Sequence, residues 1–119
     1  MLDRLPRLLL HVEGLALLVG ALVLYFDTGF GWLLLVVLLL APDLSMLGYL
    51  AGPRVGAAAY DAAHTTVVPI ALGVAGALAD ADTPVHLALV WLAHIGADRL
   101  LGYGLKYPTR FDDTHLQRL

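Results

Sequence analysis

The stretch WLLLVVLLLAPD (residues 32–43) joins an unbroken apolar run to a proline and an aspartate. Such a run, inside an apolar segment of about 20 residues, is typical of a helix that crosses the hydrocarbon core of a membrane. The proline frees a backbone carbonyl one turn earlier, and in lipid that carbonyl must be satisfied by protein, water or an ion. The aspartate adds a charge that hydrocarbon strongly disfavours. The stretch therefore predicts a membrane helix with a polar feature inside it.

The rest of the chain is similarly apolar. Of its 119 residues 60% are hydrophobic and 14% are charged, and the mean hydropathy of +0.80 is far above that of a soluble domain. Short connections require neighbouring helices to run antiparallel. We therefore predict an all-α, integral membrane, four-helix up-down bundle as a single domain over residues 1–119, with the polar tail 108–119 as a short interfacial segment. The predicted spans are Leu5–Phe26, Phe30–Leu50, Val55–Ala79 and Pro84–Tyr103.

The distribution of charged residues predicts how this bundle is oriented in the membrane. The first span lacks a small-residue cleavage site, so we expect a retained helix rather than a signal peptide. Basic residues gather at both ends and in the middle loop, which by the positive-inside rule predicts a multi-pass protein of the cell inner membrane with both termini cytoplasmic. These cations are Arg4, Arg7, Arg54, Lys106, Arg110 and Arg118.

Small residues crowd the first half of the third span, from Gly56 to Ala63. In lipid, helices associate through close packing, which small residues permit. We therefore expect the third span to be the central helix.

A layer of six ionisable side chains is the strongest functional signal. Counting 1.5 Å per residue, all six fall roughly 8–14 Å from the cytoplasmic boundary. Ionisable residues inside a membrane usually pair, face a cavity or bind an ion. The six are Glu13, Asp43, Asp61, His64, His94 and Asp98.

The spacing of these groups favours a metal site. Asp61 and His64 share one side of a helix, as do His94 and Asp98. Di-metal four-helix bundles use a similar set, although here the second pair is reversed and one residue longer. Without cysteine there is no thiolate ligand, so Zn, Mn or Fe suits the site, as one ion with a bound water or as two. The same groups could instead bond one another across helices, worth about 0.6–2 kcal/mol a pair.

Two neighbours of the layer have open roles. Tyr60, one turn before His64, either orients that imidazole as part of a catalytic site or is an amphipathic core residue. Arg99, beside Asp98, either neutralises the layer or extends to the cytoplasmic surface. No phosphate loop, serine triad or nucleic-acid motif is found in the sequence.

Three motifs resemble the family of small bacterial membrane proteins called DUF4260. They are GPRVGAAAYDAAHT (residues 52–65), HIGADRLLGYGLKY (residues 94–107) and THL (residues 114–116). The resemblance covers nearly the whole chain and implies no established activity. It departs at Asp61, where Asn is expected to be common, which weakens Asp61 as an anionic ligand. It also draws attention to His115 as a ligand, proton shuttle or lid, with a solvated histidine as the alternative.

These observations leave three functions open. The first is a metal-dependent membrane hydrolase, with Glu13 as ligand or general base and an amphiphilic substrate whose anionic head meets cationic side chains. The second is a proton-coupled transporter, because Glu13 lies midway along the first span as in small multidrug-resistance exporters. The third is a structural or partner-binding subunit, and a homo-oligomer is compatible with each. The cations proposed for the substrate rim are Arg54, Arg99, Lys106 and Arg110.

Overall fold

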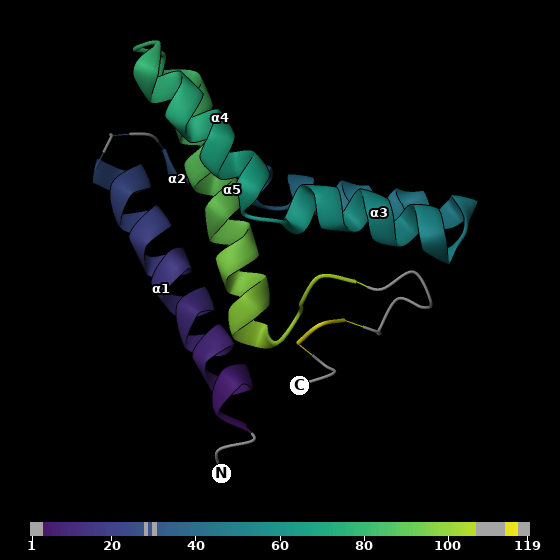
Figure 1. Ribbon diagram of the computed structural model, residues 1–119. Coiled ribbons are helices and arrows are strands. Elements are labelled where there is room, and N and C mark those ends of the chain that lie inside the picture. The colour runs from purple at the N-terminus through teal and green to yellow at the C-terminus, as the bar shows by residue number, and fades with distance from the viewer. Residues whose placement is uncertain (1–3, 28, 30, 107–113, 117–119) are drawn as a thin grey trace.

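A computed structural model describes residues 4–27, 29, 31–106 and 114–116. Its main elements are all helical, which confirms the predicted class (Figure 1). The four predicted helical segments are present with nearly the predicted bounds, but two of them are divided. The elements are α1 (Leu5–Asp27), α2 (Trp32–Leu39), the 3₁₀ helix η2 (Ala41–Ala51), α3 (Pro53–His64), α4 (Val67–Leu78) and α5 (Asp82–Leu101).

Among the described residues, three helical stretches have the length and hydropathy needed to cross a membrane. They are Leu5–Asp27, Trp32–Ala51 and Pro53–Leu78. The second consists of α2 followed by η2, and the third of α3 followed by α4. Figure 1 shows α3 leaving the bundle sideways, whereas α1, α4 and α5 run along its length. The second and third predicted spans are therefore each divided in two at a bend.

Proline explains both bends. Pro42 cannot donate to the carbonyl one turn earlier, and the next N–H, that of Asp43, bonds to Leu40 O at 3.1 Å in the tighter 3₁₀ pattern. Pro69 lies in the first turn of α4, where a missing N–H costs little. The chain breaks just before that turn, with Thr65 extended at φ −79° and ψ 141°. The two bends thus fall next to Asp43 and His64.

Helix α5 is the central helix, packing against α1, α4 and α2. The α1–α5 contact brings backbones together, because a Cβ on Gly96 would lie 2.6 Å from Leu18 N and one on Gly14 would lie 2.5 Å from Arg99 Cβ. The expectation that the third segment is central is wrong, since its first half bends out of the bundle. Its small residues instead admit η2, where Tyr49 packs directly on Gly56.

The chain folds back after α5. Gly102, at φ +98°, ends the helix in the left-handed conformation that glycine favours, and Tyr103 N–H donates to Asp98 O at 2.7 Å. Further on, Lys106 forms an isolated antiparallel bridge with Thr114. Most of the expected interfacial tail, residues 108–119, lies outside the described residues. The described part of it, Thr114–Leu116, returns to the end of α5.

Candidate metal centre

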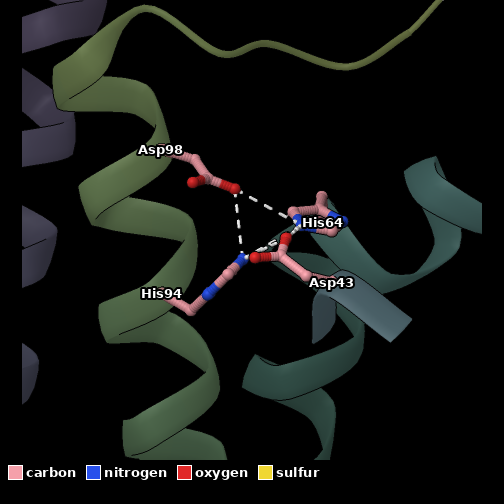
Figure 2. A group of neighbouring side chains, drawn as sticks. All are labelled: Asp43, His64, His94 and Asp98. Atoms are coloured by element: carbon pink, nitrogen blue, oxygen red, sulfur yellow. Dashed lines mark hydrogen bonds and ion pairs between the residues drawn. The ribbon is translucent and has the colours of Figure 1, made fainter. Parts of the chain in front are cut away.

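Four side chains converge where the two bends meet α5. Asp43 comes from η2, His64 from the last position of α3, and His94 and Asp98 from adjacent turns of α5 (Figure 2). One ligand atom from each lies within 4.8 Å of the other three. We call these four residues the His/Asp cluster.

The separations within the His/Asp cluster match a single coordination sphere. The two Nε2 atoms are 3.1 Å apart. His64 Nε2 lies 3.4 Å from Asp43 Oδ1 and 3.3 Å from Asp98 Oδ2, and the corresponding distances from His94 Nε2 are 3.1 and 3.2 Å. Ligands of tetrahedral zinc, bound at about 2.0–2.1 Å, are about 3.3–3.4 Å from one another. The cluster therefore fits one ion better than a pair held about 3.5–4 Å apart.

Backbone carbonyls orient both imidazoles. His64 Nδ1 donates to Tyr60 O at 2.8 Å, and His94 Nδ1 donates to Leu39 O. Because a carbonyl can only accept, each Nδ1 must carry the hydrogen, and in the neutral ring the lone pair is on Nε2, inside the cluster. Metal-binding histidines show this same arrangement. Two such lone pairs 3.1 Å apart repel one another unless a cation or proton lies between them.

Burial gives the His/Asp cluster an inner and an outer side. The side chain of His64 is fully buried and that of Asp98 is 17% exposed, whereas that of Asp43 is 38% exposed. Asp43 therefore forms the open side of the cluster, and the other three residues form its buried side.

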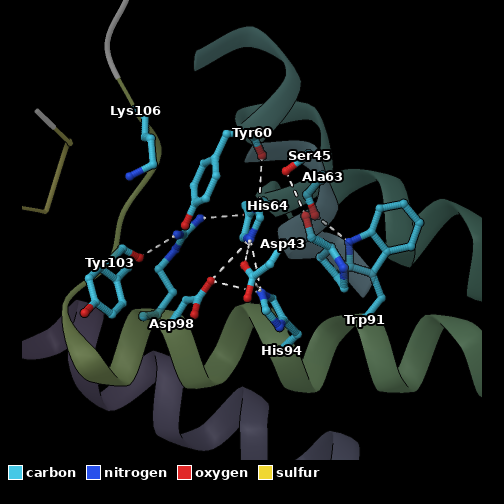
Figure 3. A network of polar contacts seen from close by, with 12 residues as sticks. Asp43, Ser45, Tyr60, Ala63, His64, Trp91, His94, Asp98, Tyr103 and Lys106 are labelled. Carbon is cyan, nitrogen blue, oxygen red and sulfur yellow. Dashed lines mark hydrogen bonds and ion pairs between the residues drawn. The ribbon is translucent and has the colours of Figure 1, made fainter. Parts of the chain in front are cut away.

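A stack of side chains covers His64. The ring of Tyr60 lies parallel to the imidazole with centroids 3.7 Å apart. Lys106 Nζ is 4.4 Å from the Tyr60 centroid, and Figure 3 shows Tyr60 between Lys106 and His64. Arg99 donates to His64 O at 3.1 Å and to Tyr103 O at 3.0 Å, which ties the end of α3 to the end of α5. These contacts hold His64 although the chain bends directly after it.

Two other predicted ligands have backbone partners instead. Asp61 Oδ1 accepts from Lys106 N at 2.6 Å. His115 Nδ1 accepts from Leu105 N at 2.7 Å, and His115 N donates to Leu105 O at 2.9 Å. Burial and the charge of Arg99 lower the pKa of His115, which agrees with an accepting, neutral ring. Both side chains hold the segment after α5 in place, and neither belongs to the His/Asp cluster.

Of the remaining predicted residues, those that the structure describes lie apart from the cluster. Glu13 is exposed on α1, because that helix turns Gly14, Ala21 and Tyr25 inward. The structure therefore does not bring Glu13 together with the four cluster residues. Arg54 is exposed at the start of α3, at the opposite end of that helix from His64. Arg110 lies outside the described residues.

Two hydrogen bonds that support the cluster were not among the predictions from the sequence. Trp91 Nε1 donates to Ala63 O, directly before His64, and neither the spacing nor the depth of these residues indicated it. The use of Leu39 O by His94 did have a signal, because Pro42 disturbs the backbone bonding of this turn.

Replacing Pro42 by alanine is expected to weaken metal binding about tenfold, the scale of a lost outer partner. The restored N–H lets the α-helix continue, so that Asp43 N competes with His94 Nδ1 for Leu39 O. A zinc titration against a competing chelator measures the change. Pro84→Ala, in the first turn of α5, is the control and should bind as wild type does. Equal affinity in all three proteins would contradict an orienting role for Leu39 O.

Comparison with known proteins identifies a family. The family model described as "Domain of unknown function (DUF4260)" matches residues 7–119. Neither the comparison with curated proteins nor that with solved structures gave a match. The predicted resemblance is confirmed, and the chain belongs to the DUF4260 family.

Proposed function

We propose that this protein is a metal-dependent enzyme of the cell inner membrane, of hydrolase type, with both termini cytoplasmic and an amphiphilic substrate. The observation that carries the proposal is the convergence of two imidazole Nε2 atoms and two carboxylate oxygens, with both Nδ1 atoms tied to backbone carbonyls. Nitrogen and oxygen ligands suit Zn²⁺, Mn²⁺ or Fe²⁺. The charges also balance, because one divalent cation neutralises the two carboxylates.

The residues divide into a fixed set and an open side. His64, His94 and Asp98 would hold the metal, and two histidines with one carboxylate form a ligand set of catalytic zinc sites. A metal bound there would supply an acidified water and polarise a carbonyl or phosphoryl oxygen. Asp43, the most exposed of the four, would act as the general base that accepts a proton from water. Asp43 thereby takes the role first expected of Glu13.

The side chains around the cluster hold His64 in position and supply positive charge. Tyr60 keeps the His64 ring in place by stacking, and Arg99 fixes the carbonyl of the same residue. Arg99 and Lys106 also bring positive charge to this end of α5, which suits an anionic head group. Arg54 is too far along α3 to share this role.

The main alternative to a metal-dependent enzyme is a structural network in which the four cluster residues form ion pairs without a metal. Two protonated imidazoles and two carboxylates are also neutral together and would hold the bends without a metal. The transporter hypothesis has less support, because its key residue, Glu13, lies outside the His/Asp cluster. Metal content separates the enzyme from the structural network.

Asp43→Asn is expected to retain metal but lose hydrolysis by at least about a hundredfold, the usual contribution of a general base. The amide keeps the size of the side chain and cannot accept the proton. Metal content and turnover of a panel of fluorogenic acyl and phosphate esters are measured on the same preparation. Asp98→Asn is the comparison, and it should lose the metal as well. If Asp43→Asn loses metal as completely as Asp98→Asn, the general-base role of Asp43 is wrong.

A further inference from the structure

An apolar cavity of about 320 Å³ lies beside the His/Asp cluster. Leu38, Leu72 and Val90 form part of its wall, where α2, α4 and α5 meet. Its hydroxyl-bearing residue, Ser45, donates to Pro42 O at 2.7 Å, so that this polar atom is already engaged. The cavity therefore suits an apolar ligand.

The two bends join this cavity to the cluster. Pro42 and Ala63 line the cavity and directly precede cluster residues Asp43 and His64 in the chain. Trp91 lines it one helical turn before His94, and Figure 3 shows Trp91 and Ala63 together on one side of the cluster. A single molecule can thus place an apolar part in the cavity and a polar part at the cluster.

The cavity opens toward the surface that meets lipid. Of its lining residues, Ala41 and Leu87 are exposed. Near this opening the outer surface is apolar, with Val37 61% and Leu40 63% exposed. A ligand can therefore enter sideways from the bilayer, where acyl chains are the abundant apolar groups.

The volume of the cavity limits the ligand to one acyl chain. The volume lies at the lower end of the usual range for ligand pockets, about 300–1,000 Å³. At about 30 Å³ for a water-sized group, it holds one chain of roughly ten carbons. A lipid with two chains would have to leave one of them outside.

We infer that this cavity binds the acyl chain of a single-chain amphiphile whose polar head lies at the His/Asp cluster. For the head the inference rests on the proposed function, because the metal would be its partner. For the chain it rests on the cavity alone, so the two parts can fail separately.

Trp91 provides a direct probe. The protein has two tryptophans, Trp91 in the cavity wall and Trp32, which is 67% exposed at the start of α2. In the full-length Trp32→Phe variant, ω-bromodecanoate should quench Trp91 fluorescence by more than half and in a saturable way. Trp91→Phe, which retains Trp32, reports partitioning of the probe into the micelle and should show quenching that rises without saturation.

Two neighbouring alanines, Ala63 and Ala62, provide a cavity variant and its matched control. Ala63 lines the cavity, whereas Ala62 is exposed and does not line it. Ala63→Leu adds three carbon atoms and should weaken the saturable quenching about sixtyfold, because each displaced methylene is worth roughly fourfold in affinity. Ala62→Leu should leave it unchanged. Ala41→Leu, at the mouth of the cavity, is a second variant in case Ala63→Leu does not fold.

The titration is made on metal-free and on zinc-loaded protein. The inference is supported if the quenching saturates and if Ala63→Leu or Ala41→Leu weakens it. Zinc is expected to strengthen the saturable quenching several-fold. If binding saturates but zinc is not bound at all, the chain subsite stands and the proposed function fails. If zinc binds but quenching never saturates, or if Ala62→Leu weakens it as much as the cavity variants do, the inference is overturned.

Discussion

His64→Ala and His94→Ala are each expected to remove the metal from the purified protein. Each deletes an Nε2 atom that lies 3.1–3.4 Å from the facing nitrogen or oxygen atoms of the other three cluster residues. Loss of an outer partner alone costs about 10–100-fold in metal affinity, so loss of a direct ligand should cost at least about a hundredfold. Elemental analysis of detergent-purified protein, with gel filtration to confirm folding, measures the result.

Helix α5 offers a matched control for these variants. His86 lies two turns before His94 on the same helix and is equally buried, with 7% and 6% of the two residues exposed. His86→Ala therefore removes a buried imidazole outside the His/Asp cluster and should keep the metal. Full metal content in His64→Ala or His94→Ala, or equal loss in His86→Ala, would refute the assignment of these ligands.

Gly96→Ala should have the largest effect on stability, lowering the free energy of unfolding by about 3 kcal/mol, the upper part of the usual range for overpacking. The new Cβ would lie 2.6 Å from Leu18 N and 2.8 Å from Gly14 O, which are backbone atoms of α1. They cannot move without separating α1 from α5, and α5 carries His94 and Asp98. Metal affinity should therefore fall as well.

The measurement is unfolding in mixed detergent micelles, and Gly20→Ala is its control. Apart from the chain neighbours and nearby backbone of α1 itself, no atom of the described residues lies within 4 Å of the Cβ that this second change would add. Since alanine is a better helix former by about 1 kcal/mol, Gly20→Ala should be as stable as wild type or slightly more so. If the two variants were equally stable, the close α1–α5 contact would be disproved.

Much of the fold follows from the apolar pattern, because lipid demands continuous helices of a certain length. That requirement is why α1 and α5 begin and end within two residues of their predicted bounds. The pattern also marked Pro42 as an irregular position. It could not give the direction of the bends, since that depends on which helices the bent segments meet after folding.

Part of the candidate site was predictable because the sequence gives the depth of each residue along its helix. Depth and helical spacing singled out His64, His94 and Asp98 together with Asp43, which the structure brings together. Depth along a helix does not give rotation about its axis, however. Glu13 was selected by its depth alone, yet it is one residue from the inward-facing Gly14 and therefore lies about 100° around the helix.

Binding of one divalent metal by the His/Asp cluster can be measured spectroscopically. The most direct test is X-ray absorption on wild-type protein purified without chelators. We expect a shell of nitrogen and oxygen ligands at about 2.0–2.2 Å, scattering from two imidazole rings, and no metal–metal distance near 3.5–4 Å. Folded protein that shows no metal absorption edge, even after dialysis against zinc, manganese and ferrous salts, would contradict metal binding by the cluster.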